Sequence, residues 1–187
     1  MRFCAACLAI LLFGASAAGA ATEFRQLTRI EPSPTALDSA FQFRKAKLYL
    51  LDDLPGAQMR NGGPTGASRI PRGGVSRDPA VGFERAYRLY GAVTALDQRR
   101  RYGQYFDFFW RAKRDAVLTV RLEYRQEKLR TYTQGREITY LHARGSHQTS
   151  FAIIGDDYFN DGRVLAWRCL LVEGGHIVAE ERSFLWR

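Results

Sequence analysis

Residues 116–126, AVLTVRLEYRQ, alternate apolar and polar side chains almost without interruption. Side chains of a β-strand point to opposite faces in turn, so Leu118, Val120, Leu122 and Tyr124 would share one face, opposite the charged residues. A helix would scatter the same apolar side chains around its circumference. The pattern therefore predicts a strand with one buried face.

Other segments carry the same signal. They are rich in β-branched and aromatic residues, and Gly, Asn, Asp or charged residues separate them. The predicted strands are 84–98, 103–113, 116–126, 136–143, 147–155, 162–173 and 176–186. In the second of them, Phe106, Phe108 and Trp110 share the predicted core face. No convincing helical period is present, so we expect an all-β domain over 84–187.

Gly174-Gly175 predicts a tight hairpin between the last two strands, because glycines supply the positive φ angles of a two-residue turn. Pairing Glu173 with His176 then sets Arg168 opposite Glu181, which would neutralise both charges in a partly buried sheet. Both faces of this hairpin are largely apolar, which indicates a strand covered on both sides or a face that meets a partner. The residues of that partner face would be Trp167, Phe184 and Trp186.

Trp110 and Cys169 stand on two of these strands, within antiparallel strands that cover 84–187. The pattern resembles an immunoglobulin or fibronectin type III sandwich, in which Trp110 would lie on strand C and Cys169 on strand F. An immunoglobulin domain would place a second cysteine on strand B, and the candidate segment 87–96 has none. Fibronectin type III-like sandwiches lack that disulfide. The resemblance implies an immunoglobulin-like antiparallel β-sandwich and no activity.

The N-terminal residues MRFCAACLAILLFGASAAGA place one positive charge before an apolar run and small residues after it. This order is typical of a secretory signal peptide, with A-x-A cleavage sites at 18–20 or 15–17. We expect residues 1–20 to be removed and the rest to be exported to the periplasm or the extracellular space. Removal of Arg2 lowers the formal charge from +9 to +8.

Removal of Cys4 and Cys7 would leave Cys169 as the only thiol, so no intramolecular disulfide is expected. No second apolar run of transmembrane length follows, and the mature chain is expected to be soluble without a membrane segment. Residues 21–54 are predicted to add one or two strands, because 41–53 alternate with period two. Residues 55–83 are rich in Gly, Pro and Arg and are predicted to form a flexible loop or linker.

The most site-like motif is GDDYFNDG at 155–162. Asp and Asn hydrogen-bond their own backbone in turns, and Gly162 tolerates a left-handed conformation, so we expect a turn. One alternative is a calcium site with the oxygen ligands Asp156, Asp157, Asn160 and Asp161. Against it, Phe159 and Arg168 occupy ligand positions of an EF-type loop. A second alternative is a small hydrolase that uses these carboxylates for acid–base chemistry.

Aromatic and basic residues predict another kind of site. Tyr105 and Phe109 lie opposite the core face of strand 103–113, where exposed rings stack on sugars or anchor a protein. A basic run, Arg99, Arg100 and Arg101, directly precedes this strand and would bind acidic groups.

These observations predict an exported, non-enzymatic β-sandwich that acts as a binding or accessory structural module. Its partner would be a protein or a cell-surface polymer, and export argues against nucleic acid. The alternatives are a carbohydrate- or surface-polymer-binding module, and the small hydrolase. No cofactor other than the calcium alternative is expected, because His142, His147 and His176 stand at no zinc-binding spacing. No G-x-S-x-G nucleophile motif is present at Ser146.

Overall fold

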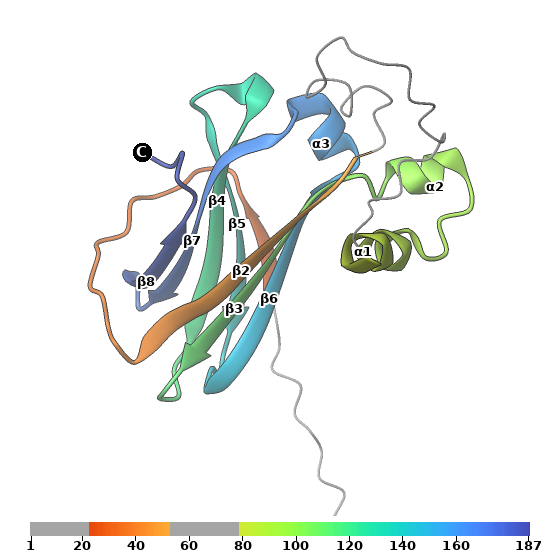
Figure 1. The fold of residues 1–187 in the computed structure, drawn as a ribbon. Coiled ribbons are helices and arrows are strands. Elements are labelled where there is room, and N and C mark those ends of the chain that lie inside the picture. The colour runs from red at the N-terminus through yellow and green to blue at the C-terminus, as the bar shows by residue number, and fades with distance from the viewer. Residues whose placement is uncertain (1–22, 53–78) are drawn as a thin grey trace, which may run out of the picture.

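The structure, a computed structural model, describes residues 23–52 and 79–187. The predicted signal peptide and most of the predicted 55–83 loop lie outside these residues. Two sheets pack face to face, and three helices lie outside them (Figure 1). The strands are β1 Glu23–Leu27, β2 Phe41–Leu51, β3 Gly103–Ala112, β4 Leu118–Gln126, β5 Thr133–Tyr140, β6 Gly145–Ile154, β7 Val164–Glu173 and β8 His176–Arg182. The helices are α1 Pro79–Leu89, α2 Ala95–Arg99 and α3 Asp156–Asp161, with a 3₁₀ turn, η1, at Glu127–Leu129.

The strand order over the described residues is β1-β5-β4-β7-β8 in one sheet and β2-β3-β6 in the other. Every neighbouring pair is antiparallel. The predicted all-β sandwich of two antiparallel sheets is therefore confirmed. The two N-terminal strands join different sheets, since β1 pairs with β5 and β2 pairs with β3.

The core between the sheets follows the predicted alternation. Every predicted inward residue of β3 and β4 is buried: Phe106, Phe108, Trp110, Leu118, Val120, Leu122 and Tyr124. Trp167 of β7 lies between them, with its ring centroid 5.3 Å from that of Phe108 in an edge-on arrangement. Because a strand allows only two side-chain directions, the period-two pattern was enough to identify these core residues.

The predicted register of the β7–β8 hairpin is right near the turn and wrong beyond it. Val172 does lie opposite Ile177, but a bulge then shifts the pairing by one residue. Arg168 consequently faces Arg182 instead of Glu181, and its guanidinium pairs with the buried Glu123 of β4 at 2.8 Å. The bulge inserts one extra residue on β8, which allows Val178 and Ala179 both to contact the core.

The strand order differs from that of an immunoglobulin domain. There, strands C and F lie in the same sheet. Here β3, which carries Trp110, belongs to the three-stranded sheet, and β7, which carries Cys169, belongs to the five-stranded sheet. The pattern of strand lengths and turns therefore predicts two layers correctly, whereas it contains no information on which strands become neighbours.

The predicted strand at 84–98 is wrong, because this segment forms α1 and α2. Helix α1 begins at Pro79, inside the predicted loop, and is followed by Gly91 at φ 79°. Thr94 starts α2 with a reciprocal capping box to Asp97. Proline in the first turn, a left-handed glycine after the end and a capping box are helix signals that period-two patterning overlooks. None of the helices in the described residues is long and apolar enough to span a membrane.

Cys169 is fully buried in the core, and burial raises the pKa of its thiol well above the usual value. We expect no reaction with a thiol reagent at pH 8 in the native state, and stoichiometric reaction after unfolding in guanidinium. The measurement uses a Cys4→Ser/Cys7→Ser chain, in which Cys169 is the single thiol. Rapid labelling of the folded protein would contradict the buried position of β7.

Candidate functional site

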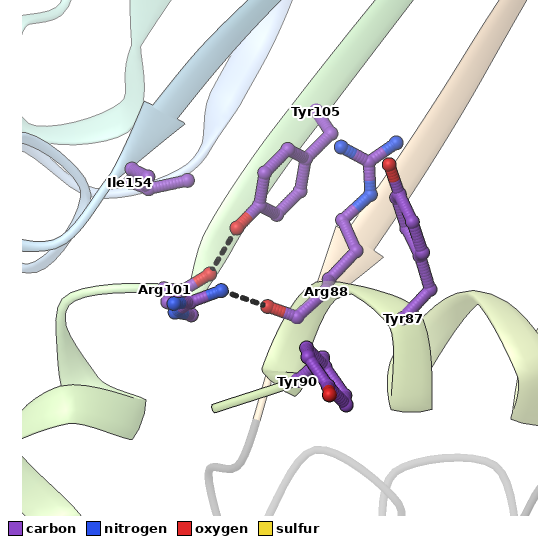
Figure 2. Close-up of a pocket in the computed structure, with 6 residues that line it drawn as sticks. All are labelled: Tyr87, Arg88, Tyr90, Arg101, Tyr105 and Ile154. Carbon is purple, nitrogen blue, oxygen red and sulfur yellow. Dashed lines mark hydrogen bonds between the residues drawn. The ribbon is translucent and has the colours of Figure 1, made fainter. Parts of the chain in front are cut away.

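A groove lies on the outer face of the three-stranded sheet, where α1 and the segment after α2 meet β3 and β6 (Figure 2). Its volume is about 630 Å³. It is lined by Tyr87, Arg88, Tyr90, Arg101, Tyr105 and Ile154. This volume lies within the range of small-ligand sites, and tyrosine and arginine side chains make up most of the lining.

Tyr105 of β3 is the most deeply buried aromatic residue of the groove, and only 8% of it is exposed. Its hydroxyl donates a 2.6 Å hydrogen bond to the Arg101 carbonyl (Figure 2). The guanidinium carbon of Arg88 lies 4.0 Å from the centroid of its ring. Burial raises the pKa of Tyr105 because it removes the phenolate from water, so this residue is a neutral hydrogen-bonding group at pH 7.

Arg88 fastens α1 to the sheet. Its guanidinium contacts Glu84 of the same helix at 2.6 Å and Asp107 of β3 at 3.2 Å. Asp107 also accepts a 2.6 Å hydrogen bond from the Ser150 hydroxyl of β6. Because two carboxylates and the face of Tyr105 already surround it, the charge of Arg88 is compensated within the protein.

Tyr87 and Tyr90 form the open side of the groove. They are 66% and 83% exposed, so their rings are accessible to solvent beside the buried Tyr105. Phe83 stacks on Tyr87 with 6.5 Å between ring centroids and 14° between ring planes. Phe83 and Tyr87 lie four residues apart on α1, and Tyr90 is the first residue after the helix ends. These three exposed rings are called the aromatic strip, and two of them, Tyr87 and Tyr90, line the groove.

The predicted ligand-binding residues separate into two groups. Tyr105 and Arg101 meet in the groove. Arg99 instead packs its guanidinium on the Phe159 ring of α3, and Arg100 is exposed at the end of α2. Phe109 lies on the same face of β3 as Tyr105 but outside the groove, where a lysine side chain covers its ring. The arginine run is split because the chain turns from a helix into a strand over these residues.

The predicted partner-face residues do not share one face. Trp167 points into the core between the sheets. Trp186 lies on the outer side of the five-stranded sheet, with its ring centroid 4.6 Å from the guanidinium carbon of Arg125. Phe184 is 88% exposed. The strand β8 ends at Arg182, and the turn that follows removes these residues from the alternation of the strand.

The acidic residues of 155–162 each have a separate partner, and Asn160 is exposed. The pairs are Asp156 with Arg99 at 3.6 Å, Asp157 with Arg136 at 2.5 Å, and Asp161 with Gln134 at 3.4 Å. Over the described ranges, no three His, Cys, Asp or Glu side chains are placed to hold a metal ion. A calcium site or an acid–base pair requires oxygens that converge on one point, and this arrangement directs them to three partners.

The same segment forms a helix, α3, instead of the predicted turn. Gly162 does adopt the expected positive φ, at 85°, and Gly155 has φ 61° at the other end. The amide of Gln126, from β4, donates to the carbonyls of Asp157 and Gly162 at 2.9 and 2.8 Å. The bond to Gly162 caps the C-terminal end of α3, where the carbonyl has no partner within the helix. The bond to Asp157 connects the first turn of α3 to β4. The cap comes from a distant strand, so the local sequence did not reveal it.

Four lining residues, Tyr87, Arg88, Tyr90 and Ile154, were not identified from the sequence. The prediction of a strand at 84–98 concealed the first three, because α1 and the turn after it bring them to the groove. The spacing of Phe83, Tyr87 and Tyr90 is the signal that would have found the aromatic strip. The groove offers aromatic faces, tyrosine hydroxyl groups and two guanidinium groups, and these side chains are suited to binding a ligand.

Comparisons with known proteins provide no guide to this site. No family model matches the chain, and no curated protein or solved structure is significantly similar to it.

Proposed function

We propose that this chain is an exported, non-enzymatic binding module that holds a saccharide in the groove. The observation that carries the proposal is the pair of exposed tyrosines, Tyr87 and Tyr90, placed beside the buried Tyr105 and Arg101. Sugar rings present an apolar C–H face bordered by hydroxyl groups. Tyrosine matches both, since its ring packs on the apolar face and its hydroxyl forms hydrogen bonds.

The compartment supports the same proposal. The N-terminal sequence is that of a signal peptide, and the periplasm and the cell exterior are rich in saccharide polymers. The groove is open along the aromatic strip, so a polymer can enter it without threading through an enclosed cavity. This openness supports a surface polymer, one of the ligand classes predicted from the sequence, over a protein partner.

We expect a Tyr87→Ala/Tyr90→Ala double variant to bind saccharide at least about ten-fold more weakly than the parent chain, because exposed aromatic anchors dominate such contacts. Isothermal titration with hexamers of glucose, of N-acetylglucosamine and of galacturonic acid measures the affinities. Tyr132→Ala is the matched control, because Tyr132 is a 55% exposed tyrosine in the β4–β5 connection, outside the groove. If no hexamer binds, or if the control loses as much affinity as the double variant, the proposal is wrong.

A further inference from the structure

The groove contains two arginines, and their environments differ. Arg88 is held between Glu84 and Asp107, with its guanidinium over the ring of Tyr105. Its charge is compensated, and its planar group is already stacked. Arg88 is therefore part of the wall of the site and not a receptor for a charged ligand.

Among the residues that the structure describes, Arg101 has no ion-pair partner. One N–H of its guanidinium donates a 3.0 Å hydrogen bond to the Arg88 carbonyl, which fixes the side chain against the end of α1 (Figure 2). Within residues 23–52 and 79–187, no carboxylate lies at ion-pairing distance from it. A guanidinium carries five N–H donors, so most of this group remains available to an acceptor in the groove.

We propose that the groove selects an acidic saccharide, with the sugar carboxylate bound by Arg101 and the ring packed on Tyr87 and Tyr90. This inference rests on the proposed function and adds the charge of the ligand to it. Arginine suits the role because its planar fork donates two parallel hydrogen bonds to a carboxylate. The contact to the Arg88 carbonyl holds that fork in place before the ligand arrives, which reduces the entropy lost on binding.

The number of uncompensated cations distinguishes a uronic acid polymer from other polyanions. Nucleic acids gain their affinity from many phosphate contacts, each with its own lysine or arginine. Within the described part of the chain, the groove offers one guanidinium without an ion-pair partner, Arg101, beside two solvent-facing rings. One carboxylate on one sugar ring matches this set, and we therefore argue for an acidic saccharide.

The test compares hexagalacturonate with its fully methyl-esterified form, in which a methyl group removes the charge of each carboxylate. We expect the parent chain to bind the acid at least about ten-fold more tightly than the ester, because the ester lacks the charge-assisted hydrogen bonds. Arg101→Gln should remove this preference, because it weakens binding of the acid much more than binding of the ester. Arg100→Gln is the matched control, since it removes the same charge from an exposed neighbour outside the groove.

Arg101→Lys provides a second variant that keeps the charge while removing the planar fork. We expect it to retain an intermediate preference for the acid. Thermal melting of each variant shows whether the chain is folded. A preference for the acid that survives Arg101→Gln would overturn the inference, and so would equal binding of acid and ester by the parent chain.

The failure of this inference is distinguishable from the failure of the proposed function. Binding of the ester with no preference for the acid would leave a neutral saccharide site. Absence of binding to both hexamers, and to hexamers of glucose and N-acetylglucosamine, would remove the saccharide site altogether. Poly-glutamate and a single-stranded DNA oligomer complete the test, and tighter binding of either than of hexagalacturonate would overturn the assignment to an acidic saccharide.

Discussion

Replacement of Gly103 by alanine is expected to destabilise the protein by about 3 kcal/mol or more, one of the two largest effects that we predict for a single substitution. Gly103 begins β3 with φ 144°, a region that residues with a side chain rarely adopt. An alanine Cβ would lie 2.7 Å from the Ile154 Cα and closer still to the Ile153 carbonyl oxygen. Both atoms belong to the backbone of β6, so no side-chain rotation relieves the collision.

Thermal unfolding checks this prediction, and a loss of about 3 kcal/mol corresponds to a melting temperature roughly 6–12 °C lower. Gly174→Ala is the matched control. Gly174 also has a positive φ, 54°, but nothing lies within 4 Å of its added Cβ. We expect Gly174→Ala to lower the free energy of unfolding by about 1–2 kcal/mol, because only the strained left-handed backbone conformation contributes to the loss. Equal losses in the two variants would show that β6 moves aside freely, contrary to the close approach of the two strands.

Phe108→Ala is expected to lower the free energy of unfolding by about 3–5 kcal/mol, because it leaves a cavity at the centre of the sandwich. Phe108 is fully buried. Its ring contacts those of Phe43, Phe151 and Trp167 edge-on, at centroid distances of 6.1, 6.3 and 5.3 Å. These neighbours come from β2, β6 and β7 of both sheets, so no single local adjustment fills the cavity.

Phe109→Ala is the control for this prediction, because the residue is the neighbour of Phe108 in the same strand and faces the other way. Phe109 is partly exposed beneath Lys47, and its truncation should cost less than about 1.5 kcal/mol. Chemical denaturation of both variants measures the difference. Similar losses of stability in the two variants would contradict the structure, in which Phe108 faces the core and Phe109 faces away from it.

The groove depends on a chain connection as much as on the sandwich. β2 and β3 are direct neighbours, with Leu51 opposite Gly103, although the connection between them is long. The described part of that connection, from residue 79 onward, folds back over the sheet and supplies Tyr87, Arg88 and Arg101 to the groove. In many proteins the residues of a binding site lie on a connecting segment, and a rigid sheet holds that segment in position.

Part of the groove could be predicted from the sequence. The alternation of β3 placed Tyr105 away from the core, and the basic run placed Arg101 beside it. The same alternation also selected Phe109, which lies outside the groove. A strand pattern reports only the face of a residue, and the helix that covers one part of that face decides which residue lines a site.

The sequence by itself determined which residues of β3 and β4 form the core, because two-fold alternation leaves each side chain only two directions. It also determined the turn at Gly174-Gly175. The tertiary structure alone decided the bulge in β8, the capping of α3 by Gln126 and the sheet to which each strand belongs. It likewise decided that Arg88 forms ion pairs, whereas Arg101 has no ion-pair partner among the described residues. These features depend on contacts between residues far apart in the chain. Local periodicity of the sequence does not predict such contacts.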